Sequence, residues 1–366
     1  MMNILILGGT GSIGNALIEL LKKNSWSVYV TSRAEKENTG NIHFIKGNAH
    51  EIEFLTKCLQ MNRWDAVIDF MAYSTPEFSN RVKLILENTE QYFFLSSSRV
   101  YAKSDSPITE ASPRLLDVCN DCAYLKTDEY ALAKARQENI LFESGKTNWT
   151  VIRPYKTYNS NRLQLGMFEK EDWLYRIMMG KTLVFPNEMK NKKTTLTYAA
   201  DVAVAIVALI GNQSAYGQAF HITTTESVAW KDVFNKYMAI LQKSVNKRIN
   251  IKYVDNIEAF YDVWNMYQIK YDCNIDRYFD NSKINKATQN AIHYTSFSEG
   301  VEKCMGDFIV SPEWRSINWK LNRWMDSITG EKTKLLDVIG MKEKARYIKY
   351  LGGVKDFSQN GLQGLA

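Results

Sequence analysis

The chain has 366 residues, of which 45% are hydrophobic and 23% charged, a composition that excludes a disordered chain and allows a full core. This length favours one large α/β domain with a smaller second part. The formal net charge of +6 is spread along the chain, so charge alone leaves nucleotide, nucleic acid and polysaccharide ligands open. We recognise neither a secretory signal nor a membrane-spanning stretch, and five cysteines predict free thiols, so we expect a cytoplasmic protein without membrane contact.

Strand and helix patterns alternate through the first half of the chain. Apolar strand patterns occur at Asn3–Leu7, Ser27–Thr31, His43–Lys46, Ala66–Phe70, Tyr92–Ser96 and Trp149–Arg153. Helical periodicity occurs at Ile13–Lys23, Ile52–Leu59, Phe78–Glu87 and Tyr130–Phe142. Such alternation predicts an α/β fold with a doubly wound parallel sheet, covered by helices on both faces.

The rhythm loosens after about residue 158. We therefore expect a dinucleotide-type domain over residues 1–157 and a smaller, mainly helical substrate-binding lobe over 158–350, with some return to the sheet around 195–225. Trp264–Tyr267 and Trp314–Trp324 are interpreted as aromatic-rich helices, because the five-residue step between tryptophans favours a packed helix over a nucleic-acid stacking surface. Residues 351–366 are interpreted as a flexible tail.

A glycine-rich turn follows the first predicted strand and precedes the first predicted helix. Gly8, Gly11 and Gly14 are spaced as G-x-x-G-x-x-G. In that context a dinucleotide fingerprint is expected, with glycines that allow a tight turn, a close approach of the pyrophosphate and close helix packing. The amino terminus of the helix would add unpaired amide groups and a positive dipole end. The alternative is a plain glycine turn.

A tyrosine and a lysine lie four residues apart in the helix that begins at Tyr130. Tyr130 and Lys134 therefore share a face of that helix. A nearby ammonium favours the phenolate of a tyrosine, so this pair could move a proton to or from an alcohol while nicotinamide exchanges a hydride. Ser96, Ser97 and Ser98 end the preceding strand, where ligands bind in parallel sheets, and one hydroxyl could orient the reacting oxygen.

In this order and context, the motifs resemble the extended short-chain dehydrogenase/reductase superfamily, and within it the NAD-dependent epimerase/dehydratase family that acts on nucleotide sugars. The resemblance covers roughly residues 3–240. It includes Asp65–Asp69 leading into Met71 and Ala72, Glu138 one turn after Lys134, the stretch Val151–Pro154, and Thr197–Ala203.

The resemblance implies a Rossmann domain and a role for each matched residue. Tyr130 would be the acid/base, Lys134 would hold the nicotinamide ribose and tune the tyrosine, and Ser97 would assist, with Ser98 as the fallback. The cofactor would contact the glycine turn, the end of the second strand and the fourth. These cofactor-binding positions are Gly8, Thr10, Gly11, Ser12, Ile13, Gly14, Arg33, Asn48, Met71, Ala72, Tyr130 and Lys134.

The chain departs from the family pattern at several positions. The 4,6-dehydratases carry Thr-Asp-Glu where this chain has Ser97-Ser98-Arg99, which argues against water elimination and leaves epimerisation or reduction of a 4-keto sugar open. An arginine, Arg33, follows the second strand where an acidic residue is usual, so NADP is slightly favoured over NAD, although Asn48 in place of an aspartate leaves this uncertain.

Ser98, Arg99 and Lys156 are the expected substrate-binding residues, Lys156 because it follows Arg-Pro-Tyr where relatives often have asparagine near the substrate diphosphate. Four basic residues of the expected substrate lobe could also contact phosphates, but each is interpreted as a solvated surface charge: Arg162, Lys190, Lys192 and Lys193. Cys119 and Cys122 form a lone C-x-x-C without further ligands, so no metal site is expected.

The expected function is a nucleotide-sugar epimerase or 4-ketoreductase with a tightly bound NAD(P), in the synthesis of sugars for a cell-surface polysaccharide. A homodimer formed by a four-helix contact is expected, and no nucleic-acid partner. The rival hypothesis is a redox-sensing or RNA-binding regulator on the same fold, but such relatives commonly lose the Tyr/Lys pair that this chain keeps.

Overall fold

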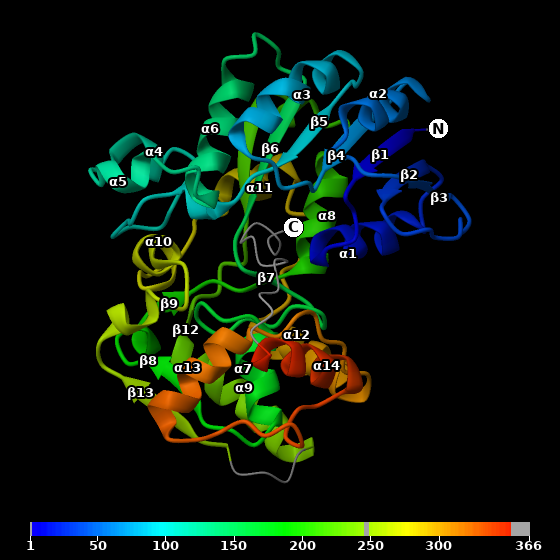
Figure 1. Cartoon of the computed structure of the whole chain (residues 1–366). Helices are drawn as coiled ribbons and strands as arrows, with labels where there is room; N and C mark the ends of the chain where they lie inside the picture. Colours follow the sequence, from blue (N-terminus) through cyan, green and yellow to red (C-terminus); the bar gives the residue numbers. More distant parts are fainter. Residues whose placement is uncertain (1, 245–248, 353–366) are drawn as a thin grey trace.

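The computed structural model describes residues 2–244 and 249–352, so the expected flexible tail at 351–366 lies almost wholly outside the described residues. Figure 1 shows a sheet domain above a smaller lobe, with α10 beside the junction of the two. Within the described ranges, no helix combines the length and the apolar character needed to cross a membrane.

A seven-stranded parallel sheet forms the larger part, in the order β11-β6-β5-β4-β1-β2-β3. The strands are β1 (Asn3–Leu7), β2 (Ser27–Ser32), β3 (Ile42–Lys46), β4 (Ala66–Asp69), β5 (Tyr92–Leu95), β6 (Trp149–Pro154) and β11 (Gln218–Ile222). The chain order reverses between β1 and β4, which makes the edge above these two strands a topological switch point. The predicted doubly wound α/β fold is confirmed.

Alternate side chains of each strand enter different cores on the two faces of the sheet. Ile4 and Ile6 pack beneath α1, α8 and α11, whereas Leu5 and Leu7 pack beneath α2 and α3. The helices of the sheet domain are α1 (Ser12–Leu21), α2 (Ile52–Gln60), α3 (Thr75–Glu87), α6 (Tyr130–Phe142), α8 (Ala199–Leu209) and α11 (Ser282–Ala287). Helices therefore cover both faces of the sheet, and ligands can approach it at the carboxyl ends of its strands.

Three short strand pairs and a set of helices form the lobe. The pairs are β7 (Thr157–Tyr158) with β10 (Thr197–Tyr198), β9 (Lys193–Thr194) with β12 (Val228–Ala229), and β8 (Leu183–Pro186) with β13 (Ile251–Val254). The helices are α7 (Lys170–Met178), α9 (Trp230–Ser244), α10 (Met266–Gln268), α12 (Phe297–Val310), α13 (Trp319–Thr329) and α14 (Met341–Leu351). A π-helix, η5 (Ile269–Cys273), continues α10 and carries a residue of the candidate site.

Two predicted aromatic helices are wrong in extent. Residues 314–318 are irregular and α13 begins at Trp319, while Trp264 precedes the three-residue α10. Trp314 packs edge-on against Tyr175 and Phe308, with ring centroids 4.9 Å apart in each pair. The Trp314 ring thus packs against α7 and α12, and this contact accounts for a tryptophan at a position that is not helical.

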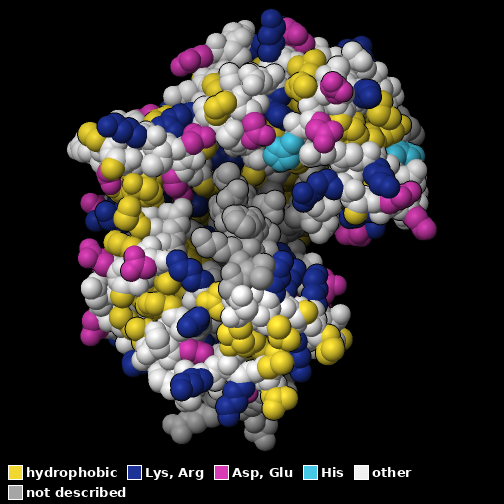
Figure 2. Space-filling model, viewed as in Figure 1, with side chains coloured by type: hydrophobic (Ala, Val, Ile, Leu, Met, Phe, Trp, Pro, Cys, Tyr) yellow, Lys and Arg dark blue, Asp and Glu magenta, His cyan; other side chains and the backbone are white. Residues whose placement is uncertain are grey.

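Basic side chains are distributed over the face of the molecule in Figure 2 and do not form one continuous patch. This agrees with the even spread of charge along the sequence. Two short helices, α4 (Leu115–Val118) and α5 (Cys122–Leu125), lie in the loop between β5 and α6. α4 packs on α6, so part of the outer face of α6 is covered within the chain itself.

Candidate active site

The glycine turn has the geometry that a pyrophosphate cradle requires. Gly8 adopts a φ of +72°, a left-handed conformation, and a Cβ there would lie 2.5 Å from the Met71 sulfur. A Cβ on Gly14 would lie 2.6 Å from the carbonyl oxygen of Gly9, so only glycine lets α1 pack this close to the turn. The amide of Gly8 also donates to Thr31 Oγ1 at 3.0 Å, which ties the turn to β2.

The first turn of α1 is left without a side-chain cap. Gly11 is its N-cap residue and offers no side chain, and the Ser12 hydroxyl instead donates to Asn159 Oδ1 of the loop after β7 at 3.2 Å. Thr10 is exposed, and Ile13 is buried with its side chain at the pocket described below. Uncapped amides beside strands β1 and β4 fit the diphosphate of a dinucleotide.

The other expected cofactor contacts border the same edge of the sheet. Met71 and Ala72 follow β4 and are half-buried, with the Met71 amide donating to Asp69 Oδ1 at 2.9 Å. Arg33 is exposed after β2, and we find no ion pair between it and any residue in the described ranges. Asn48 donates to Glu51 at 3.3 Å and accepts from the amide of His50.

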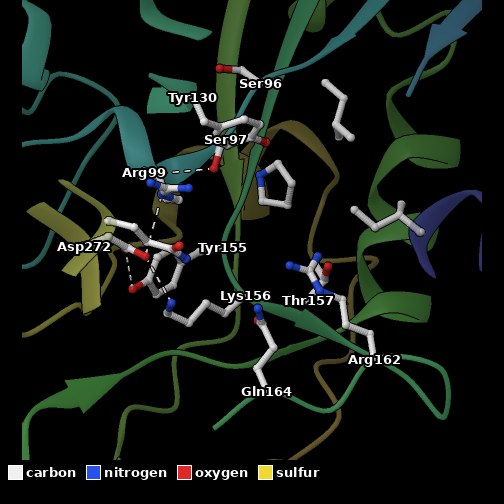
Figure 3. A pocket seen from close by; sticks show the side chains of 14 residues that line it. Ser96, Ser97, Arg99, Tyr130, Tyr155, Lys156, Thr157, Arg162, Gln164 and Asp272 are labelled. Carbon is white, nitrogen blue, oxygen red and sulfur yellow. Dashed lines mark hydrogen bonds and ion pairs between the residues drawn. The ribbon is translucent and has the colours of Figure 1, made fainter. Parts of the chain in front are cut away.

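A pocket at the carboxyl edge of β5 and β6 collects Tyr130, Ser97 and Arg99 (Figure 3). Tyr130 is the first residue of α6, and Ser97 precedes the 3-10 turn η1 (Ser98–Val100) after β5. Burial raises the pKa of the Tyr130 phenol overall, although the Arg99 charge, a hydrogen bond with the Ser97 hydroxyl and the Arg162 charge reduce that rise. The two residues predicted to work together therefore share one hydrogen bond.

Lys134 lies one turn further along α6, beneath the phenol. Its Nζ is 6.0 Å from the centre of the Tyr130 ring and 4.6 Å from that of Phe94, and the side chain is only 3% exposed. Burial lowers the pKa of Lys134 to about 8, while the carboxylates of Asp69 and Glu138 oppose that change. Lys134 is therefore a buried cation on the same face of α6 as Tyr130.

The three expected substrate contacts differ in their surroundings. Ser98 is fully buried, and its hydroxyl donates to the carbonyl of Arg153 at 2.8 Å, so it points into the sheet domain. Arg99 and Lys156 line the pocket. Lys156 has a φ of +37°, an unfavourable conformation for a lysine, of the kind that gathers at functional sites.

Asp272 of η5 lies on the lobe side of the pocket, close to three cationic side chains, Lys156, Arg99 and Arg277. It accepts from Lys156 Nζ at 3.1 Å and from the Tyr155 hydroxyl at 2.9 Å, and lies 3.8 Å from Arg99 Nε. Burial alone would raise the pKa of Asp272, but Lys156, Arg99 and Arg277 together hold it well below its usual range. Asp272 therefore stays ionised and joins the lobe to the sheet domain.

Sequence reasoning missed several pocket residues. Arg162, interpreted as a solvated charge, is buried and donates to Glu169 Oε1 at 3.0 Å, so that interpretation is wrong, whereas Lys193 is exposed as expected. Gln164 is 3% exposed, and its Oε1 makes no hydrogen bond with the described residues. Neither Gln164 nor Asp272 lies in a motif, and only the lobe's own packing brings them to the pocket.

The charged residues next to this pocket have structural partners. Glu138 is fully buried and accepts from Arg153 and Ser96, which holds α6 against β5 and β6. In the part of the chain that the structure describes, no group of three or more His, Cys, Asp or Glu residues could hold a metal ion.

A model of the NAD dependent epimerase/dehydratase family matches residues 4–222, which is more than half of the chain. The chain is 27% identical over 246 residues to chloroplast stem-loop binding protein of 41 kDa b of Arabidopsis thaliana, covering 62% of this chain and 60% of the relative. It is 19% identical over 251 residues to 2'-dehydrokanamycin reductase of Streptomyces kanamyceticus, covering 67% and 68%. The chain thus spans three fifths of the length of the chloroplast relative.

Solved structures share the fold at low identity. The enzyme WbmH of Bordetella bronchiseptica, in complex with NAD+, superimposes with a TM-score of 0.65 at 17% identity, covering 84% of this chain and 98% of that one. UDP-glucuronic acid 4-epimerase of Bacillus cereus, in complex with NAD, gives a TM-score of 0.62 at 16% identity, covering 84% and 96%. The family match therefore shows that the protein belongs to the NAD dependent epimerase/dehydratase family, and the solved structures share its fold.

Proposed function

We propose that this protein is a nucleotide-sugar epimerase or 4-ketoreductase in which Tyr130 is the acid/base. The observation that carries the proposal is the meeting of Tyr130 and Ser97 in one pocket, with the Lys134 ammonium 6.0 Å from the phenol ring. A bound nicotinamide dinucleotide supplies reversible two-electron oxidation and reduction of a sugar carbon.

The chain's own residues handle the proton. Tyr130 takes the proton of the sugar hydroxyl as that carbon is oxidised, or returns it on reduction, and the Ser97 hydroxyl orients the reacting oxygen. Burial raises the pKa of the Tyr130 phenol overall, and the positive charges around the ring reduce that rise, which favours the phenolate relative to a buried tyrosine without them. Lys134 binds the ribose and adds to that charge.

The surroundings of Ser98 and Arg99 support an epimerase or reductase over a dehydratase. Elimination of water needs an additional acid and base, and a carboxylate pair would serve. Here the Ser98 hydroxyl is bound to the backbone of Arg153, and Arg99 is a permanent cation. No additional proton donor or acceptor of that kind faces the sugar from these two positions.

The cofactor is proposed to be NADP or NAD, with NADP slightly favoured. The diphosphate would lie on Gly8, Gly11 and Gly14, and the exposed Arg33 would meet a 2′-phosphate. Exchange of Arg33→Ser should weaken NADP+ binding about tenfold or more while changing NAD+ binding little, measured by calorimetric titration of both. Equal effects on the two cofactors would contradict this assignment.

The setting proposed is the synthesis of sugars for a cell-surface polysaccharide, with a homodimer as the working unit. The outward residues of α3 are polar, namely Ser79, Asn80, Lys83 and Glu87, so a four-helix contact would be hydrophilic on that helix. Light scattering on the purified protein measures its mass directly. A monomer at micromolar concentration would refute the dimer.

Tyr130→Phe tests the catalytic assignment. The variant should bind the dinucleotide as the wild type does and lose at least 100-fold in turnover on the nucleotide sugars that the wild type converts. Tyr278→Phe is the matched control, because that hydroxyl donates to the Asp105 carbonyl away from the pocket. Equal turnover by wild type and Tyr130→Phe would show that the phenol is not the acid/base.

A second candidate function is binding of a stem-loop RNA, suggested by the name of the 27% identical chloroplast relative and by the net charge of +6. The two functions separate in one experiment. An RNA-binding role predicts affinity for a stem-loop that falls steeply with salt and is unchanged in Tyr130→Phe, whereas the enzyme role predicts loss of turnover in that variant.

A further inference from the structure

Arg99 lies against the face of Tyr130. It belongs to η1, directly after β5, and its guanidinium carbon is 5.1 Å from the centre of the Tyr130 ring. The side chain is 7% exposed, so water screens its charge little. Figure 3 shows the guanidinium between the Tyr130 and Ser97 side chains above and Asp272 below.

Two carboxylates from different parts of the chain hold Arg99 in place. Its Nη2 donates to Glu129 Oε1 at 2.7 Å, and its Nε lies 3.8 Å from Asp272 Oδ2 without a hydrogen bond to any described residue. Glu129 is itself fixed, because it also accepts from the Tyr124 hydroxyl and from the amide of Ala131. The guanidinium is therefore pre-organised beside the phenol.

Arg99 is better suited than Lys134 to stabilise a negative phenol. The Lys134 nitrogen is farther from the ring centre, at 6.0 Å, and its lowered pKa of about 8 means that its charge is lost in mildly alkaline solution. An arginine keeps its charge at every accessible pH. A persistent positive charge beside Tyr130 therefore comes from η1, outside the Tyr-x-x-x-Lys motif.

We propose that Arg99 is a positioning residue for the reaction, whose guanidinium favours the phenolate of Tyr130. The proposal rests on the proposed function only for the use made of that phenolate. The other groups around the phenol are the positive Arg162 and Lys134, the negative Glu129 and the neutral Ser97 hydroxyl. Burial has the largest effect on the pKa of Tyr130 and raises it overall, and Glu129 also raises it. Among the groups that lower it, Arg99 has the largest effect, ahead of Ser97 and Arg162.

The test is a titration of Tyr130 itself. The protein is labelled with ¹³Cζ-tyrosine, the Tyr130 resonance is assigned by its loss in Tyr130→Phe, and its chemical shift is followed against pH without substrate. Arg99→Gln should raise the apparent pKa of Tyr130 by about one unit or more, and Arg99→Lys should recover part of that change. Arg136→Gln removes an arginine of α6 that is paired with Asp128, and should leave the titration unchanged.

A second variant, expected to shift the pKa of Tyr130 in the opposite direction, distinguishes an effect of charge from an effect of disturbed structure. Glu129→Gln keeps an oxygen for the cap of α6 but removes the nearby negative charge, so the pKa of Tyr130 should fall. A folding defect would not move the two variants in opposite directions. An unchanged titration in Arg99→Gln would overturn the proposal, even if turnover fell.

The pH profile of turnover then connects the charge to the reaction. If Tyr130 is the base, the rising limb of kcat should move to higher pH in Arg99→Gln by the same amount as the NMR titration. A shifted titration together with full turnover in Tyr130→Phe would leave the effect of Arg99 on the phenol established and refute the proposed function instead.

Discussion

Lys134→Met should make the protein more stable at neutral pH while removing activity. Burial lowers the pKa of Lys134 from 10.5 to about 8, so holding its charge in the folded protein costs free energy. At about 1.36 kcal/mol per pKa unit, the cost at pH about 7 is about 3 kcal/mol. Methionine fills a similar volume without a charge. Loss of the ammonium also removes a favourable partner of buried Asp69, which reduces the gain.

The pH dependence of this gain in the free energy of unfolding is the sharper test. It compares the same two proteins, wild type and Lys134→Met, at two pH values. Between pH about 8 and about 10.5 the unfolded chain binds the proton of Lys134 more than the folded chain does, so wild-type stability rises with pH relative to the variant. The advantage of Lys134→Met should shrink by about 2 kcal/mol between pH about 7 and about 9.5.

Urea unfolding of both proteins at the two pH values measures this change. Lys126→Met is the control, since Lys126 is exposed in the turn before α6 and its replacement should give no such pH dependence. A difference between wild type and Lys134→Met that stays constant with pH would mean that the ammonium is not held against a burial cost, and the reasoning about its charge would fail.

Three further substitutions test the packing around the site. Gly14→Ala places a Cβ 2.6 Å from the Gly9 oxygen and should cost about 1–3 kcal/mol and lower dinucleotide affinity, whereas Gly306→Ala, in open space on α12, should be neutral or stabilising by urea unfolding. Asp272→Asn removes the charge of a carboxylate that lies beside three buried cations, Lys156, Arg99 and Arg277, and should cost about 3–5 kcal/mol at neutral pH. Because the folded pKa of that carboxyl is depressed, the loss should shrink below pH about 4; a loss independent of pH there would contradict the argument. Glu138→Gln leaves buried Arg153 without its partner charge and should also cost about 3–5 kcal/mol, so a value below about 1 kcal/mol would show that the pair is replaceable.

The sheet domain could be predicted from the sequence because its signals are local. Each strand and helix carries its own apolar period, and the predicted helix Tyr130–Phe142 has the bounds that the structure gives to α6. The glycine turn is equally local, since a left-handed φ at Gly8 and the close approach at Gly14 both demand glycine. For these elements, residues close in sequence determine the local backbone conformation.

The lobe side of the site could not be predicted, because distant packing decides it. Asp272 meets Lys156 across 116 positions, and no spacing rule links them. Arginine is a residue type that usually lies at the surface, yet the folded lobe buries Arg162 beside Glu169. The irregular segment around Trp314 shows the same limit, since a partly buried aromatic ring can pack from a loop as well as from a helix.

The position of β11 at the sheet edge decides which fragments of this chain can fold. β11 pairs in parallel with β6, but 63 residues separate the last residue of one strand, Pro154, from the first of the other, Gln218. Those residues include α7 and α8, so the chain leaves the sheet, builds part of the lobe and supplies a covering helix before it returns. A fragment cut after residue 157 would keep the pairing of β6 with β5 but lose its pairing with β11, and it would expose an apolar face where α8 packs on α1. The two parts are consequently separate in space, but a single cut of the chain does not separate them. A protease that cuts between β6 and β11, or a gene fusion that breaks the chain there, would release no intact sheet domain.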